Sequence, residues 1–261
     1  MREQSLEDLL ERLKASLRVK GIFTMGSTAT GLNPVSDLDL VVVLDRNPEG
    51  LMSVFTTVAG RFADIFAFDL DFMKGLTGKA EVSATGFEGM VVEWLSKGRI
   101  EYDPEGVLLT LKEWIRSHQP RQVIADHEKR AGWSKINYNY LANTRFFRHG
   151  DALYRQALEV RLLYSVMDIL LEYFDFRDVP WRGEKVAIRY LEEHDKPFLA
   201  AFQGYTDSRD LAGRMQHYEE LFDRVFFGPW QKWQIAFAVA NSKDRVDDPE
   251  LLVFWKSLAG E

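Results

Sequence analysis

Residues 26–39 read GSTATGLNPVSDLD, and they stand between two apolar stretches, GIFTM at 21–25 and LVVVL at 40–44. Aspartate is a poor strand former. Two carboxylates on one strand face also repel each other unless a positive group lies between them. Asp37 and Asp39 are therefore hard to explain as ordinary members of a strand. We interpret this segment as a turn and a strand entry that together form part of a binding site.

Composition places the chain among ordinary globular proteins. Its 261 residues are 46% hydrophobic and 28% charged, with a formal net charge of -7, and this length is enough for two domains. The sequence contains no cysteine, which excludes disulfides, thiolate metal sites and cysteine nucleophiles. No apolar run approaches the ~18–20 residues of a membrane span, and the N-terminus has no apolar signal core. We therefore expect a cytoplasmic protein without a membrane partner, and the negative charge disfavours a long nucleic acid.

The first 104 residues alternate between short strands and helices. Apolar, β-branched and aromatic runs predict strands at residues 21–25, 38–44, 61–70 and 99–103, the last at a sheet edge. Helical spacing predicts helices at residues 5–19, 48–60 and 86–98. Ser5 and Asp8 fit a capping box at the start of the first helix. We predict a small mixed sheet with helices for residues 1–104.

The sequence pattern changes after Pro104. Long helical patterns cover residues 104–118, 121–148, 151–175, 182–195, 208–227, 230–242 and 249–258. Strand signals are nearly absent from this half, so we predict an all-α helical bundle for residues 105–261. The whole chain is then of the α+β class, with two domains.

Three carboxylates are candidates for one site. Asp37 and Asp39 are two residues apart on a predicted strand, so their side chains share a face, while Leu40 and Val42 point to the other face. Asp64 lies within the next predicted strand, where an unpaired carboxylate among aromatic residues is costly. Carboxylates from neighbouring strands would be tolerated around Mg²⁺ or Mn²⁺, because these hard ions prefer oxygen ligands and often bind phosphate as well.

The Gly26-Ser27 pair is a candidate for binding phosphate at the same site. Glycine lets the backbone approach a ligand closely, and backbone N–H groups at the start of a helix bind phosphate. The Ser27 hydroxyl adds one more donor. A triphosphate between this turn and the carboxylates, bridged by metal, would be attacked by a hydroxyl and release pyrophosphate. The residues therefore indicate nucleotidyl transfer.

At these positions the sequence resembles the DNA polymerase β-like nucleotidyltransferase superfamily. The closer resemblance is to antibiotic nucleotidyltransferases that adenylylate streptomycin and spectinomycin. The positions that are similar to their pattern are Gly26, Ser27, Gly31, Leu32, Pro34, Ser36, Asp37, Asp39 and Leu40. Their later strand, which begins with arginine and carries a third acid, looks like the segment from Arg61 to Asp64.

The resemblance implies roles for these residues. It implies that three of them bind the phosphates of the nucleotide, namely Gly26, Ser27 and Ser36. It implies that the carboxylates bind metal and carry the catalysis, namely Asp37, Asp39 and Asp64. The antibiotic enzymes have glutamate as the third acid and use it as the catalytic base. Asp64 is shorter, and it is expected to bind metal, to act as the base, or to do both.

Two other acids compete for the third position. Asp69 and Asp71 come shortly after Asp64 in the sequence, at and just after the end of the same predicted strand. Their simpler interpretation is a solvated strand end. We favour Asp64, because it lies within the strand and follows Arg61.

The helical half contains candidates for binding the acceptor. Lys135, Asn139 and Arg145 are expected roughly along one side of a helix, with Arg148 close by, and Lys185 is a further candidate. Each one taken singly is also explained as part of a solvated charged face. The tryptophans of this half could stack on a base or a sugar, although core packing explains them as well.

We therefore predict a two-domain nucleotidyltransferase. The catalytic domain, residues 1–104, would use Mg²⁺ or Mn²⁺ to transfer NMP, as AMP from ATP, to a hydroxyl of a small acceptor and release pyrophosphate. The domain of residues 105–261 would bind that acceptor. One alternative is NMP transfer to a protein or to tRNA, as in toxin–antitoxin nucleotidyltransferases. Another is a catalytically inactive nucleotide-binding regulator.

Overall fold

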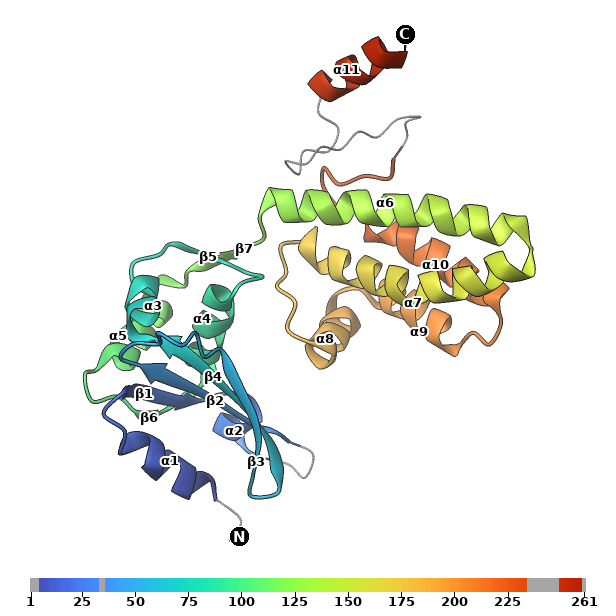
Figure 1. Ribbon diagram of the computed structural model, residues 1–261. Coiled ribbons are helices and arrows are strands. Elements are labelled where there is room, and N and C mark those ends of the chain that lie inside the picture. Colours follow the sequence, from blue (N-terminus) through green and yellow to red (C-terminus); the bar gives the residue numbers. More distant parts are fainter. Residues whose placement is uncertain (1–4, 33–35, 234–248, 260–261) are drawn as a thin grey trace. The chain divides into compact units, whose positions relative to one another are not determined.

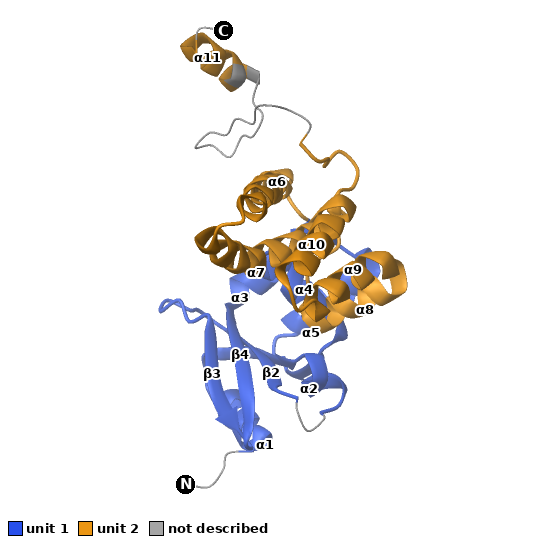
Figure 2. Cartoon of the chain, turned by 90° about the vertical axis from the view of Figure 1, so that its right-hand side faces the viewer, with its two compact units in different colours: residues 1–123 blue, residues 124–261 orange. Residues whose placement is uncertain are grey.

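The computed structural model describes residues 5–32, 36–233 and 249–259 (Figure 1). The chain divides into two compact units, residues 1–123 and residues 124–261 (Figure 2). The first unit combines a sheet with helices and the second is helical, so the α+β class is confirmed.

The first unit is built around a five-stranded sheet with the strand order β3-β4-β2-β1-β6. The strands are β1 (Val19–Thr24), β2 (Leu38–Leu44), β3 (Ser53–Val58), β4 (Arg61–Asp69) and β6 (Arg99–Tyr102). Strands β2 and β4 are parallel, whereas the other neighbours are antiparallel. The sheet is therefore mixed, as predicted, and the four predicted strands are confirmed, with β6 at an edge.

Helices cover both faces of this sheet (Figure 1). They are α1 (Leu6–Lys14), α2 (Gly26–Thr30), α3 (Leu70–Leu76), α4 (Phe87–Lys97) and α5 (Val107–His118). Leu40 and Val42 of β2 pack in the core that includes Leu10 of α1. Val41 and Val43 pack in the core formed with α3, α4 and α5. A strand buried on both faces reads as a continuous apolar run, which explains the sequence of β2. The capping box at Ser5 and Asp8 is also confirmed.

The helix predicted at residues 48–60 was wrong. Residues 53–58 instead form strand β3, which pairs antiparallel with β4. The segment SVFTTV is rich in β-branched and aromatic residues, which favour strands. Ala59 and Gly60 connect the two strands with φ values of 51° and 72°, the conformation of a two-residue hairpin turn. The spacing of Leu51, Phe55 and Val58 also fits a helix, so periodicity alone did not decide this segment.

The hairpin turn leads to a stability prediction. Ala59 is in the left-handed region, where alanine is strained and asparagine is better tolerated. We expect Ala59→Asn to stabilise the protein by about 0.5–1 kcal/mol, measured by urea unfolding. Ala63 lies buried within β4, so Ala63→Asn relieves no backbone strain and should destabilise instead. Destabilisation by Ala59→Asn would contradict this turn geometry.

The boundary between the units lies later in the chain than the sequence indicated. We placed it between residues 104 and 105, whereas the compact units divide after Val123. Helix α5 belongs to the first unit because Leu108, Leu111 and Ile115 pack in one core with α3 and α4. A short parallel ladder adds two strands that we did not predict, β5 (Glu81–Ser83) and β7 (Arg121–Val123). Helix α3 was not predicted either.

The described part of the second unit contains five helices around an aromatic core. They are α6 (Asp126–His149), α7 (Ala152–Asp175), α8 (Glu184–His194), α9 (Lys196–Asp207) and α10 (Leu211–Val225). A further helix, α11 (Pro249–Ala259), follows later in the chain. The largest fully buried side chains of the core include Tyr173, Phe198 and Tyr218. The predicted helical bundle is confirmed in class, although α9 was not predicted.

Part of one predicted helix falls outside the described residues. Of residues 230–242, the first four form a bridge and irregular structure rather than a helix, and residues 234–242 lie outside the described residues. Among the helices that the structure describes, none has the length and apolar character needed to cross a membrane.

Candidate active site

The aspartates from the two predicted strands lie side by side. In the parallel pair β2 and β4, Asp39 is directly opposite Asp64, and partners in such a register point to the same face of a sheet. Asp37 lies two residues before Asp39, immediately before β2 begins. Strand β1 runs antiparallel to β2. Gly26, just after the C-terminal end of β1, therefore lies beside the N-terminal end of β2. The sequence therefore folds so that the acids and the Gly-Ser turn meet.

Hydrogen bonds fasten the Gly-Ser turn to the entry of β2. The backbone N–H of Met25 donates to the carbonyl oxygen of Asp39 at 3.1 Å. The backbone N–H of Asp39 donates to the hydroxyl oxygen of Thr28 at 2.8 Å, and that hydroxyl donates to the carbonyl oxygen of Asp37 at 3.5 Å. Thr28 is buried. Sequence reasoning missed this residue, and its position in the segment after Gly-Ser was the available signal.

Gly26 lies against one of the carboxylates. Its φ is +54°, and a Cβ built on it would lie 2.8 Å from Oδ2 of Asp39. Glycine adopts this left-handed backbone and close approach without strain, whereas any other residue would be strained here. The turn is consequently in direct contact with the acid cluster.

The two serines of the predicted site occupy flanking positions. Ser27 is half-buried in the first turn of the short helix α2. The carbonyl oxygen of Ser36 accepts a hydrogen bond from Nη1 of Arg61 at 2.9 Å. Arg61 is the first residue of β4. This bond therefore links Ser36, the residue before Asp37, to the strand that carries Asp64. Pro34, part of the sequence pattern, lies outside the described residues.

Burial and neighbouring charges raise the pKa of two of the acids. Partial burial raises the pKa of Asp39 to about 6, and the nearby charges of Asp37 and Asp64 add to this rise. Partial burial, followed by the charge of Asp37, also raises the pKa of Asp64. Oδ1 of Asp64 is buried and has no hydrogen-bond partner in the described part of the chain. The neighbouring carboxylates are thus close enough to oppose the ionisation of Asp39 and Asp64.

The acids have the chemistry that suits a divalent cation. Their oxygen donors are the ligands that Mg²⁺ and Mn²⁺ prefer, and the unpartnered Oδ1 of Asp64 and the raised pKa of Asp39 are features that a cation would relieve. Among residues 5–32, 36–233 and 249–259, no group of three or more acidic or histidine side chains is already arranged as a metal site. The donor chemistry therefore fits a metal, while a closed ligand set is not preformed.

The competing acids lie away from this cluster. Asp69 is the last residue of β4, and Asp71 is in the first turn of α3. Asp69 lies five positions after Asp64, which is roughly 17 Å along a strand. An acid in the first turn of a helix also has a structural explanation, since it stabilises the helix dipole.

The candidates in the second unit do not form one group. Nζ of Lys135 is 3.0 Å from Oδ1 of Asp168 on α7, and the buried Asn139 donates to Oδ2 of Asp168 at 3.1 Å. Arg145 and Arg148 are exposed near the end of α6. The six residues from Asn139 to Arg145 correspond to about 240° around a helix, so these two do not share a side.

Lys185 and the tryptophans are the remaining candidates of the second unit. Lys185 is exposed on α8, and it has no ion pair with Asp168 in the described residues. The rings of Trp230 and Trp233 each pack on Trp133, and Nε1 of Trp133 donates to the carbonyl oxygen of Gln231 at 2.5 Å. These tryptophans contribute to packing.

Comparisons with known proteins bear on the first unit. Residues 5–84 match the family model described as nucleotidyltransferase domain. No curated protein matches the chain. Among solved structures, the chain is similar to a nucleotidyltransferase-like protein from Exiguobacterium sibiricum 255-15, with 11% sequence identity and a TM-score of 0.46 over 84% of this chain and 73% of that chain.

The matched segment contains the Gly-Ser turn and the strands that carry the three aspartates. Residues 5–84 are a nucleotidyltransferase domain. The chain is accordingly a transferase, of the class that transfers nucleoside monophosphate groups.

The contact between Gly26 and Asp39 leads to a prediction about activity. We expect Gly26→Ala to lower kcat/KM for nucleotidyl transfer by about tenfold or more, because a displacement of about 1 Å at a reacting centre has large effects on rate. Pyrophosphate release measures the rate. Gly50→Ala is the matched control, since Gly50 also has a positive φ of +65° but nothing lies within 4 Å of its added Cβ. Equal losses in the two variants would show that backbone strain alone is responsible.

Proposed function

We propose that the chain transfers AMP from Mg-ATP to a hydroxyl of a small hydroxylated molecule and releases pyrophosphate. The observation that carries this proposal is the pairing of Asp39 with Asp64 across β2 and β4, with Gly26 against the Asp39 carboxylate. Nucleotidyl transfer needs acidic ligands and a phosphate-binding turn at one place, and the proximity of the acids to the Gly-Ser turn supports the proposal.

The residues of the first unit would divide the work between binding and proton transfer. The Gly26-Ser27 turn, together with Ser36, would bind the phosphates. Asp37, Asp39 and Asp64 would hold Mg²⁺ or Mn²⁺. When bound, the metal would supply charge that stabilises the leaving pyrophosphate and makes the attacking hydroxyl more acidic.

Asp64 is the proposed proton acceptor. As the hydroxyl oxygen forms its bond to the α-phosphorus, the bond from that phosphorus to the bridging oxygen breaks and pyrophosphate leaves. The hydroxyl proton passes to the Asp64 carboxylate, whose raised pKa makes it a better base than an ordinary aspartate. Its Oδ1 lacks a hydrogen-bond partner in the described residues, so no hydrogen bond there lowers its affinity for a proton.

The second unit is proposed to bind the acceptor. Lys135, Arg145, Arg148 and Lys185 stay candidates for this role. The net charge of -7 favours a small acceptor over tRNA. The resemblance to antibiotic nucleotidyltransferases suggests a polyhydroxylated acceptor, and the choice of ATP and the cytoplasmic location stay predictions.

The experiment is an acceptor screen with ATP labelled at the α-phosphate. Purified protein is incubated with Mg²⁺ and with aminoglycosides, lincosamides, tRNA or cell lysate, and labelled product and pyrophosphate are both measured. We expect metal-dependent labelling of a small molecule that Asp37→Ala abolishes. Labelling of tRNA or protein alone would favour the alternative acceptors. ATP binding that is independent of metal and unaffected by Asp37→Ala, without pyrophosphate release, would instead indicate a regulator.

A further inference from the structure

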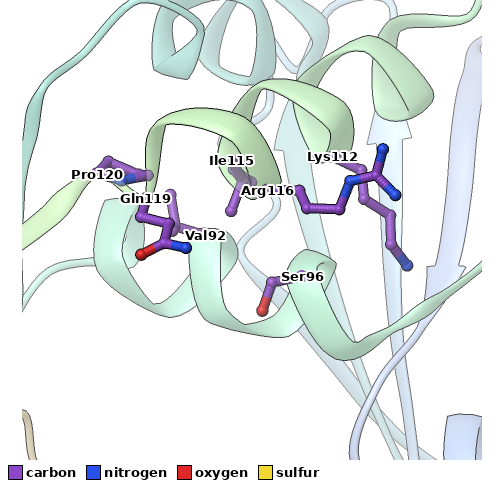
Figure 3. A pocket seen from close by; sticks show the side chains of 7 residues that line it. All are labelled: Val92, Ser96, Lys112, Ile115, Arg116, Gln119 and Pro120. Carbon is purple, nitrogen blue, oxygen red and sulfur yellow. The ribbon is translucent and has the colours of Figure 1, made fainter.

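A pocket of about 350 Å³ lies between helices α4 and α5, within the first unit (Figure 3). Its polar lining comes from Ser96, Lys112, Arg116 and Gln119. Pockets that bind small molecules typically measure about 300–1,000 Å³, so this volume suits a small ligand. None of the residues assigned to nucleotidyl transfer lines the pocket.

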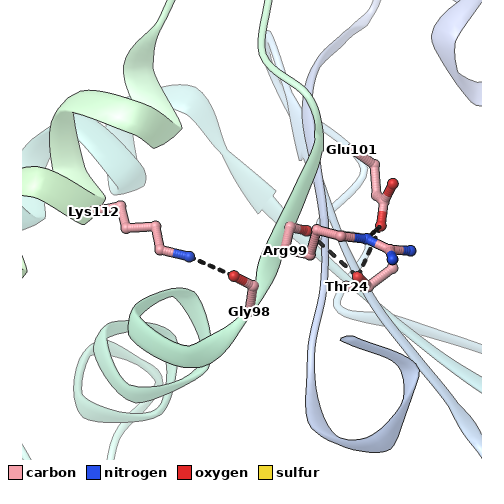
Figure 4. Close-up of polar contacts among 5 residues, drawn as sticks. All are labelled: Thr24, Gly98, Arg99, Glu101 and Lys112. Atoms are coloured by element: carbon pink, nitrogen blue, oxygen red, sulfur yellow. Dashed lines mark hydrogen bonds and ion pairs between the residues drawn. The ribbon is translucent and has the colours of Figure 1, made fainter. Parts of the chain in front are cut away.

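Two positive side chains stand one helical turn apart at this pocket. Figure 3 shows Lys112 and Arg116 extending from α5 toward the same side. Nζ of Lys112 donates to the carbonyl oxygen of Gly98 (Figure 4), which uses one of its three donors. Arg116 is exposed, and within the described residues its side chain has no hydrogen bond or ion pair. The planar guanidinium group therefore remains available for a phosphate or carboxylate.

The charge of Arg116 has a simpler partial explanation. It lies in the last turn of α5, where a cation stabilises the helix dipole. That effect needs no pocket and no second cation. It also does not explain Gln119, which ends α5 with a left-handed φ of 46° at a position where glycine is usual. Gln119 thus places a side chain at a strained backbone position, and this side chain lines the pocket.

The inner wall of the pocket is apolar. It consists of Val92, Ile115 and Pro120, all of which are buried. A pocket with cations at one side and an apolar wall matches a ligand that carries both an anionic group and an organic part. Inorganic phosphate would use the cations alone, whereas a phosphate ester would contact the wall as well.

We propose that this pocket is a second binding site, which recognises a small phosphate-bearing ligand through Arg116 and Lys112. It is distinct from the acid cluster, because none of Asp37, Asp39 and Asp64 lines the pocket. In the absence of metal those aspartates repel anions. Binding at this pocket depends neither on the identity of the acceptor nor on the transfer reaction.

A series of contacts connects this pocket to the end of β1, next to the Gly-Ser turn. A Cβ on Gly98 would lie 2.6 Å from the carbonyl oxygen of Thr24, so α4 ends directly against the end of β1. Thr24 is also held from the side, since its hydroxyl donates to Oε1 of Glu101 at 2.9 Å (Figure 4). Gly26 follows two residues later. A ligand that binds Lys112 would therefore affect Gly98, to which Lys112 donates its hydrogen bond. Gly98 packs against the end of β1, close to the start of the Gly-Ser turn.

Calorimetric titration in the presence of EDTA tests the site without metal-bound nucleotide. The ligands are inorganic phosphate, AMP and adenosine. We expect phosphate or AMP to bind to the wild-type protein and adenosine not to bind. Arg116→Glu should weaken binding roughly tenfold or more, because it replaces a charge-assisted contact by repulsion. Tighter binding of AMP than of phosphate would assign the site to phosphate esters, and equal binding would assign it to the free ion.

Two control variants test whether the loss is specific to this pocket. Lys97→Glu makes the same change of charge at an exposed residue of α4 that does not line the pocket and is paired with Glu93 at 2.9 Å. Asp37→Ala disables the proposed catalytic site. Both should bind phosphate or AMP as the wild type does. Absence of binding to the wild type, binding of adenosine as tight as that of AMP, or an equal loss in Lys97→Glu would overturn the proposal.

Discussion

Replacement of Asp39 by asparagine is expected to lower kcat/KM for nucleotidyl transfer by about 10²–10³-fold, the usual effect of removing one group that stabilises a charged transition state. Asp39 lies opposite Asp64 and against Gly26, so it is central to the proposed ligand set. Pyrophosphate release at saturating Mg²⁺ measures the effect.

The same variant should not lose stability. Partial burial and the neighbouring aspartates raise the pKa of Asp39 to about 6, so its negative charge opposes folding at pH 8 and a neutral amide of similar shape removes that opposition. Asp69→Asn, at the C-terminal end of β4, is the matched control and should leave activity within about twofold. A loss of activity that accompanies unfolding, or an equal loss in Asp69→Asn, would argue against the assigned role.

Glu172 gives the second large expected effect, on stability rather than activity. It lies on α7 with 5% of its surface exposed, and its Oε2 has no hydrogen-bond partner in the described residues. Its carboxylate packs against Gly132 of α6 so closely that a Cβ on this glycine would lie 1.8–1.9 Å from it. Burial raises the pKa of Glu172 to about 8, with Asp175 and Asp168 adding to the rise and Lys135 opposing it.

This shift predicts that stability falls as the pH rises. Between the ordinary pKa of 4.5 and the folded value of about 8, the folded state keeps a proton that the unfolded chain has lost. The folded state then binds more protons, so the free energy of unfolding decreases with increasing pH. Over three pH units within this window the decrease is up to roughly 4 kcal/mol. Asp175, whose pKa burial raises to about 6, contributes in the same direction below pH 6.

Urea unfolding at pH 5 and pH 8 measures this effect. Glu172→Gln should be more stable than the wild type at pH 8 and should lose much of the pH dependence, because the amide keeps the shape without the charge. Glu192→Gln, at an exposed position of α8, is the control and should follow the wild-type curve. A pH dependence that Glu172→Gln leaves unchanged would disprove the assignment to this carboxylate.

The sequence was most informative where chemistry and local structure agreed. Asp39 interrupts an apolar run and Asp64 interrupts an aromatic one, which predicted both strands and a shared site. Which acids would be direct neighbours was not readable from one strand alone, because pairing is a tertiary property. The register now shows Asp39 opposite Asp64. Thr28 was missed for a similar reason, since its role depends on hydrogen bonds to residues about ten positions away.

The errors occurred where two patterns fitted one segment or where a helix had several possible partners. Residues 48–60 fit a helical period, but the turn at Ala59 and Gly60 and pairing with β4 select a strand. Helix α5 was predicted, whereas its core was not, since its apolar side could pack on either unit. Its packing with α3 and α4 was decided by tertiary contacts.

The pairing of Asp39 with Asp64 also has a consequence for folding fidelity. Side chains alternate between the two faces of a strand, so a slip of one residue between β2 and β4 would turn Asp64 toward the opposite face. That face is filled by Leu38, Leu40 and Leu10, where an unpaired carboxylate would be costly. The buried Asp64 carboxylate would destabilise the misaligned sheet, whereas in the native alignment Asp64 lies beside Asp39. The carboxylates thus help to select the alignment on which their own function depends.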